Sequence, residues 1–265
     1  LIHLPSLITK LGIVQVTHDH YHYWAWTAES LVRTNRDGNY LQDDIERLFL
    51  LTVDFAVGKL TRVPVSEKIF EENKQMNELS SPHAKRAMIN SHRAATQLCH
   101  PLLEGLLRRL CSDYVELDGM IKSGKKILKM DGEEKESGRV NNVGDLLHHY
   151  ENRVAGDEIA DALESIRYAI SQYSKTSSGY DIINSWRHPH SHGGERLSGS
   201  EHVVLLNIAC LLVWQSVPRQ KYEGIDKSRY DRNILETSKA SSLNHSDYYP
   251  LKETRHLLSE SSRFV

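Results

Sequence analysis

Arg187 and His192 form the pair of side chains in this chain best suited to phosphate chemistry. They stand in the segment 184–194, with the letters NSWRHPHSHGG, so that four residues separate them. Arginine presents a planar fork of donors that matches phosphate oxygens, and histidine can accept or release a proton near neutral pH. Such a pair can bind and cleave a phosphodiester.

The residues around this pair predict a turn between two helices. Pro189 should prevent a regular helix through the segment, and Gly193-Gly194 would let the backbone approach a ligand closely. An amphipathic pattern precedes the segment and a strongly apolar one follows it. We therefore expect Arg187 and His192 to lie in a turn and not on a buried stripe.

The Arg-x4-His element, followed by Gly-Gly and an apolar helix, resembles the signature of HEPN domains in the form that ends in His-Gly. The run LLEGLL at residues 102–107 is similar to the Leu-Glu-x-Leu-Leu run in the first long helix of that family. The resemblance covers residues 81–217, about half of the chain. His188 stands where family members most often have Asn, and Pro189 is a second departure.

The resemblance implies an endoribonuclease that needs no metal and no cofactor. The ribose 2′-OH would attack the adjacent phosphate and leave a 2′,3′-cyclic phosphate and a 5′-OH. His192 would move protons, and Arg187 would hold the phosphate and stabilise the transition state. His188 would orient or assist, and Glu104 on the upstream helix would help to position Arg187.

The resemblance also implies partners for such an enzyme. In the family, two motifs face each other across a two-fold dimer, which supplies a second acid–base residue. The expected partners are therefore RNA, a second copy of the chain, and a larger defence complex or a sensor domain. Antiviral defence or toxin activity is the setting that the family most often implies.

Two other functions compete with this interpretation. A non-catalytic HEPN module would bind RNA, a nucleotide or a protein, and its sequence would look the same except for a broken motif. A metal-dependent hydrolase is suggested by His18, His20 and His22, which alternate after an apolar run and would share one face of a strand. The same three histidines also fit ordinary packing among the neighbouring aromatic residues.

The charge of the chain gives no global attraction to nucleic acid. Its 265 residues include 33 Lys and Arg against 35 Asp and Glu, with 39% hydrophobic residues. RNA contact must therefore come from a local basic patch. The candidates are Arg108, Arg109, Lys125 and Lys126, although such runs are also typical of solvated helix faces.

Cysteine use and hydropathy indicate a protein of the cytoplasm. Cys99, Cys111 and Cys210 lie in apolar surroundings without a Cys-x-x-Cys pattern, which favours small core residues over disulfides or zinc ligands. The longest apolar run, residues 203–214, is shorter than the roughly 18 residues that a membrane span needs.

Apolar spacing predicts an all-α protein. Acidic Asp43 and Asp44 should begin a helix that ends at Gly58, and a second helix should follow at residues 67–79. Ser81-Pro82 should begin a third helix, which Pro101 must kink or end. The first of these helices would bury one face: Ile45, Leu48, Phe49, Thr52, Val53 and Ala56.

The second half of the chain should complete the bundle. Residues 122–142, rich in charge and glycine, are expected to be a mobile connection. The next helix should begin at Asp157 and end at residues 177–179, and another should cover residues 203–217. The buried stripe of the first of these would comprise Ile159, Leu163, Ile166, Ile170 and Tyr173.

These elements predict three regions. Residues 1–80 would form a mostly helical N-terminal region, residues 81–217 a HEPN-like bundle, and residues 218–265 a polar extension. Because the helix at residues 203–217 is apolar on nearly every side, we expect a subunit partner to cover part of it.

Overall fold

The computed structural model describes residues 20, 23–25, 27–28, 31, 41–57, 71, 75, 82–172, 179–191 and 201–216. Within them the regular structure is helical except for one small hairpin and two isolated β-bridges, which confirms the all-α prediction. The helices are α3 (Asp43–Val57), α5 (Pro82–Leu110), α6 (Val143–His149), the π-helix η1 (Tyr150–Val154), α7 (Asp157–Ser171), α8 (Gly179–Ser191) and α9 (Glu201–Gln215). The strands are β1 (Ile127–Leu128) and β2 (Glu134–Lys135).

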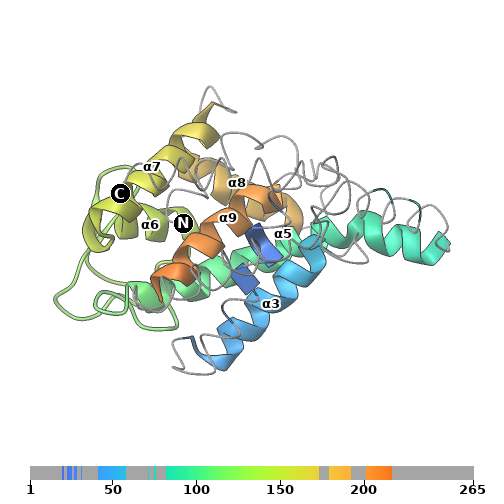
Figure 1. The fold of residues 1–265 in the computed structure, drawn as a ribbon. Coiled ribbons are helices and arrows are strands. Elements are labelled where there is room, and N and C mark those ends of the chain that lie inside the picture. The colour runs from blue at the N-terminus through green and yellow to red at the C-terminus, as the bar shows by residue number, and fades with distance from the viewer. Residues whose placement is uncertain are drawn as a thin grey trace, which may run out of the picture.

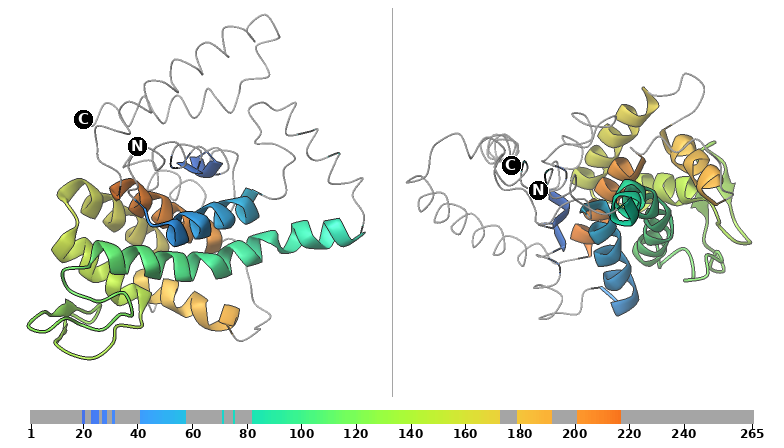
Figure 2. Two further views of the ribbon diagram at one scale, coloured as in Figure 1. Left: turned by 90° about the horizontal axis from the view of Figure 1, so that it is seen from below. Right: turned by 90° about the vertical axis from the view of Figure 1, so that its right-hand side faces the viewer.

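Helix α9 lies at the centre of the bundle, with α5 running the length of the molecule beside it (Figures 1 and 2). All residues from 201 to 214 are buried. Helices α3, α5 and α7 contact α9, and α6 and α8 pack on α5. The single chain already covers α9, so its apolar circumference gives no reason to expect a subunit partner, contrary to the sequence argument.

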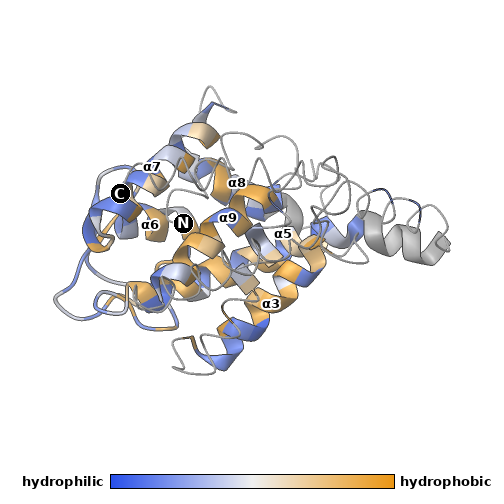
Figure 3. Cartoon of the chain, in the orientation of Figure 1, coloured by the Kyte–Doolittle hydropathy of each residue, from blue (hydrophilic) through white to orange (hydrophobic). Residues whose placement is uncertain are grey.

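Helix α3 follows its predicted pattern closely. Three acidic residues occupy its first turn, where they stabilise the positive end of the helix dipole. Figure 3 shows apolar and polar residues along this helix. The buried residues are Ile45, Phe49, Thr52, Val53 and Ala56, and Leu48 is half-buried.

Residues before position 80 share the core of the bundle. The indole N–H of Trp24 donates to the side-chain oxygen of Asn207 in the middle of α9 at 2.8 Å. Leu31 and Phe49 belong to the same apolar cluster as the α9 residues. These described residues of the N-terminal region therefore pack into the bundle. The expected helix at residues 67–79 and the extension at residues 218–265 lie outside the described residues, apart from residues 71 and 75.

Two prolines lie within helices, which excludes one of the two alternatives for Pro101 and corrects the expectation for Pro189. Pro101 lies inside α5, and no new helix begins there. Its ring is exposed, while Leu102 and Leu103 beside it are fully buried. Burial of each leucine stabilises the folded state by about 2 kcal/mol. The two contributions together offset the roughly 3 kcal/mol cost of an internal proline.

Pro189 is the second such residue, because α8 continues through it to Ser191. Arg187 therefore lies on a helix and not in the expected turn. The buried residues Tyr180, Ile182 and Ile183 fix α8 against α6 and α7. This packing stabilises the helix that the local sequence alone disfavours.

The segment at residues 122–142 contains regular structure, contrary to the expectation of a mobile connection. Strands β1 and β2 pair antiparallel, with Ile127 opposite Lys135. Ile127 is fully buried, and Lys126 forms ion pairs with Glu134 and Glu136. These contacts position the segment over α6.

Helix α7 buries four residues of its predicted face, Ile159, Leu163, Ile166 and Ile170, whereas the fifth, Tyr173, lies outside the described residues. The helix ends earlier than expected, at Ser171. Gly179, predicted to end it, is the first residue of α8. The three cysteines are buried and free, as predicted. No helix among the described residues is long and apolar enough to cross a membrane.

Candidate phosphate-binding site on helices α5 and α8

The C-terminal half of α8 carries Arg187 to the C-terminal part of α5. Its Nη2 lies 3.7 Å from Oε2 of Glu104, and its Nη1 donates to the backbone carbonyl of Asn141 at 3.0 Å. These contacts join α8 to α5 and to the loop before α6. The structure thus brings together two residues that are 83 positions apart and that the family resemblance paired.

Glu104 contacts a second guanidinium. Its Oε1 accepts from Nη2 of Arg108, one turn further along α5. Arg108 also donates from Nη1 to the carbonyl of Leu117 at 3.0 Å. The three residues of this cluster, Glu104, Arg108 and Arg187, carry one negative and two positive charges, and the Asp118 carboxylate also interacts electrostatically with Arg108.

The cluster is open to solvent on the Arg187 side. The Arg187 side chain is 37% exposed, whereas Glu104 is 17% exposed. A guanidinium held by a partly buried carboxylate loses little further conformational freedom when it binds an anion. The arrangement is therefore suited to a phosphate that approaches Arg187 from solvent.

Gly119 sets the position of Arg108. Its φ of +88° is a backbone conformation that favours glycine, and a Cβ there would lie 2.8 Å from Nη2 of Arg108. The same Cβ would lie 2.9 Å from the carbonyl of Val140. Sequence analysis missed this residue. Its position in the turn dipeptide Asp118-Gly119 is the one signal that could have identified it.

A second charged cluster fixes the other end of α8. The Tyr180 hydroxyl donates to Oε2 of Glu151 at 2.6 Å, and Arg167 donates to Oε1 of the same carboxylate at 3.0 Å. Burial, reinforced by the Glu151 carboxylate, raises the pKa of Tyr180 well above its usual value. The phenol therefore stays protonated and acts as a donor. This clamp of Glu151, Arg167 and Tyr180 joins η1, α7 and α8.

Two glycines allow α8 to begin close to its neighbours. A Cβ on Gly144 of α6 would lie 2.9 Å from the carbonyl of Tyr180, and a Cβ on Gly179 would lie 2.5 Å from the carbonyl of Arg167. Both distances are too short for a side chain. The missing Cβ atoms thus set the angle at which α8 leaves the clamp and carries Arg187 to α5.

The four basic residues predicted to bind RNA lie in different environments. Arg109 donates to Oε1 of Gln42 at 2.7 Å and to Oδ2 of Asp44 at 2.9 Å, so it links α5 to the start of α3. Arg108 belongs to the Glu104 cluster. Lys125 and Lys126 are exposed and line a separate pocket beside the hairpin.

The predicted acid–base residues are only partly placed. The backbone of His188 belongs to α8, and His192 lies outside the described residues. The structure therefore positions Arg187 and Glu104 but gives no geometry for a proton transfer.

The alternative metal site loses its structural premise. His20 is helical and fully buried, where a strand was needed to align the three histidines, and His18 and His22 lie outside the described residues. Burial lowers the pKa of His20 to about 4, and its ring packs 5.5 Å from that of Trp24. Among the described residues, no group of three His, Cys, Asp or Glu side chains is placed to hold a metal.

Comparison with known proteins provides no relative from which a role for these residues could be transferred. No family model matches the chain, and no similar curated protein or solved structure was found.

Proposed function

We propose that this protein is a HEPN-type endoribonuclease that cleaves RNA without a metal. The observation that carries the proposal is the contact between Glu104 of α5 and Arg187 of α8, in a cluster with a net positive charge. The motif resemblance assigns phosphate binding to this arginine and a positioning role to this glutamate. The all-α architecture is compatible with the same family.

In the proposed reaction, the 2′-oxygen attacks the phosphorus and the bond to the 5′-oxygen breaks. One imidazole removes the proton of the 2′-OH, and a second acid gives a proton to the 5′-oxygen. Arg187 balances the extra negative charge of the five-coordinate phosphorus. His192 supplies one of these groups in each chain, so the proposal includes a homodimer in which the second copy supplies the other.

The remaining parts of the proposal rest on the resemblance and on the sequence. They are a cytoplasmic location, assistance from His188, and a role in defence or as a toxin, with a defence complex or sensor domain as a further partner. None of them is needed for the central test.

Cleavage of a defined single-stranded RNA by the purified protein tests the proposal. Arg187→Ala and His192→Ala should each reduce the rate by about 10²-fold or more, the usual effect of losing an acid–base group or a transition-state charge. Arg139→Ala is the matched control, because the Arg139 side chain is 52% exposed and pairs with an exposed carboxylate, that of Asp118. Product analysis should find a 2′,3′-cyclic phosphate.

Three outcomes would reject the proposal. Equal cleavage by the parent and both variants would show that the site is wrong. Loss of activity with a chelator would favour a metal-dependent hydrolase. RNA binding that depends on Arg187, without any cleavage, would identify a non-catalytic binding module.

A further inference from the structure

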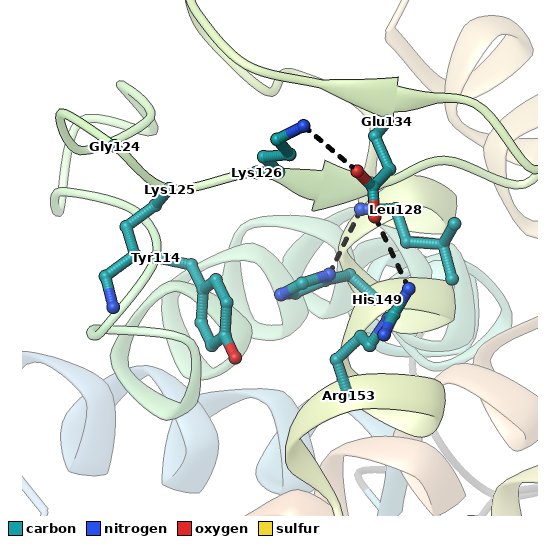
Figure 4. A pocket seen from close by; sticks show the side chains of 8 residues that line it. All are labelled: Tyr114, Gly124, Lys125, Lys126, Leu128, Glu134, His149 and Arg153. Atoms are coloured by element: carbon teal, nitrogen blue, oxygen red, sulfur yellow. Dashed lines mark hydrogen bonds and ion pairs between the residues drawn. The ribbon is translucent and has the colours of Figure 1, made fainter.

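A pocket separate from the Arg187 cluster lies between the hairpin and helices α6 and η1. We call it the hairpin pocket and define it by Tyr114, Lys125, Lys126, Glu134, His149 and Arg153 (Figure 4). Its volume is about 200 Å³. This is below the roughly 300 Å³ at which pockets for whole small-molecule ligands begin, so it fits a single chemical group.

The lining of the hairpin pocket is cationic. Two lysines and one arginine face a single carboxylate, Glu134, which gives a net charge of +2. Glu134 lies between Lys126 at 3.4 Å and Arg153 at 3.4 Å. Glu136, outside the lining, contacts Lys126 at 2.6 Å. Even with Glu136 included, one positive charge remains uncompensated.

Lys125 carries the uncompensated charge. Its ammonium lies 5.5 Å from the centre of the Tyr114 ring, and no carboxylate among the described residues lies within ion-pair distance of it. A cation–π contact at an exposed site is weak compared with a charged hydrogen bond. The ammonium can therefore turn to an anion without breaking an ion pair.

His149 adds a buried donor. The backbone N–H of Leu128 donates to its Nδ1 at 3.1 Å, so the proton of the neutral ring sits on Nε2. The residue is 1% exposed, and Nε2 has no hydrogen-bond partner in the part of the chain that the structure describes. Figure 4 shows this nitrogen on the side of the ring that faces Tyr114. A buried donor without an acceptor is costly, and a ligand oxygen would remove that cost.

We propose that the hairpin pocket binds a phosphate group. A phosphate offers several oxygens to surrounding donors, and Lys125, His149 and Arg153 are three of the residues that line this one small space, with the Tyr114 ring between Lys125 and His149 (Figure 4). Glu134 holds Lys126 and Arg153 in place when the pocket is empty and competes with the ligand for both. The phosphate comes from an RNA strand or from a free nucleotide. The site is distinct from the Arg187 cluster and does not depend on the proposed cleavage.

The first test measures binding of a fluorescent single-stranded RNA in which every 2′-OH is methylated, so that cleavage by 2′-OH attack is impossible. Lys125→Ala should weaken binding about fivefold at 0.1 M salt and reduce the salt slope by about 0.7, the value for one lost contact to a single strand. Glu134→Gln should tighten binding, because it removes the competing carboxylate. Lys122→Ala is the matched control on the same segment, and it should bind as the parent does.

The second test distinguishes the two sources of phosphate. Inorganic phosphate and a 5′-mononucleotide are titrated into protein with ¹⁵N-labelled histidine, and the Nε2 signal of His149 is followed, assigned by its loss in His149→Gln. A shift that disappears in Lys125→Ala supports a site for free phosphate groups; a response to RNA alone supports a strand contact. Parent-like binding of RNA, phosphate and nucleotide by both Lys125→Ala and Glu134→Gln would overturn the proposal.

Discussion

Helix α8 carries an arginine–glutamate cluster near each end, and the two clusters differ in charge. At its start, the clamp of Glu151, Arg167 and Tyr180 uses both oxygens of one carboxylate for one guanidinium and one phenol. Near its other end, Glu104 serves two guanidinium groups, those of Arg108 and Arg187. The first cluster has one carboxylate for one guanidinium group, and the second has one carboxylate for two.

Exposure does not separate the two clusters. The Arg167 side chain is 36% exposed and that of Arg187 is 37% exposed. The difference lies in how many cations share each carboxylate and in how deeply that carboxylate is buried, 6% exposed for Glu151 against 17% for Glu104. A balanced, buried cluster holds structure together, whereas an unbalanced one retains the ability to bind an anion.

The comparison gives each end of α8 its own role. The clamp and the close contacts at Gly144 and Gly179 fix where the helix starts. The packed stretch between Tyr180 and Ile183 transmits that position along the helix to Arg187. Changes at the clamp should therefore lower stability, and changes at the Glu104 cluster should act mainly on phosphate chemistry.

The largest effect on stability is expected from Glu151→Gln. It removes the charge that compensates Arg167 and leaves one acceptor oxygen in place of the two that Arg167 and the Tyr180 hydroxyl use, and breaking such a pair costs about 3 kcal/mol of unfolding free energy. Urea denaturation measures it. Glu164→Gln is the matched control, because Glu164 lies 3.8 Å from the same arginine but is 67% exposed, and it should cost less than about 0.5 kcal/mol. Equal losses in both variants would contradict the structural role of the clamp.

Gly144→Ser tests the close approach of α6 to the same end of α8. The new Cβ would meet the Tyr180 carbonyl at 2.9 Å and the sulfur of Met130 at 2.8 Å, so α6 must shift, at a cost of about 2 kcal/mol. Gly156→Ser is the control, since nothing lies within 4 Å of its Cβ and serine suits the N-cap position of α7. Thermal unfolding of both variants should show a lower midpoint for Gly144→Ser alone.

Elements with a local signal could be predicted from the sequence. Helices α3, α7 and α9 show their apolar pattern within 15 residues each, and the start of α5 shows in Pro82. A motif led to the prediction that Arg187 and Glu104 act together, and the structure brings the two side chains within 3.7 Å of each other. The sequence did not indicate that Arg108 is the third member of this cluster, and suggested it only as a surface contact to RNA.

The parts that could not be predicted depend on contacts between distant segments. Pro101 and Pro189 both predict a break, yet buried neighbours hold the helices through them. The hairpin forms because Ile127 is buried against the bundle, which no local pattern reveals. The clamp joins residues 151, 167 and 180, and nothing in their spacing indicates that they meet.

Acid should weaken the region beside the clamp. Burial, with smaller effects from Arg153 and His148, lowers the pKa of His149 from 6.5 to about 4. The unfolded chain takes up this proton near pH 6.5 and the folded chain only near pH 4, so stability falls as the pH drops through that window, by about 2 kcal/mol at pH 5. His149→Gln should remove this part of the pH dependence and keep the part due to His20. Identical pH profiles of urea unfolding for parent and variant would contradict the prediction.

The smallest effect concerns Glu104, which in the proposed reaction would act through Arg187 as a positioning residue. In Glu104→Gln the cluster keeps both guanidinium groups and gains one positive charge, so substrate phosphate should bind more tightly and KM should fall. Arg187 loses its orienting partner, and kcat should fall about tenfold. A misplaced guanidinium loses more of its interaction with the transition state than of its interaction with the bound substrate. Asp44→Asn is the control. Asp44 of α3 pairs with Arg109, which lies on α5 as Glu104 does but is not a member of the cluster. A merely destabilised protein would lose active molecules, lowering the apparent kcat with KM unchanged, so a fall in both parameters distinguishes positioning from structural damage. A rise in KM at unchanged kcat would show instead that Glu104 contributes only to binding.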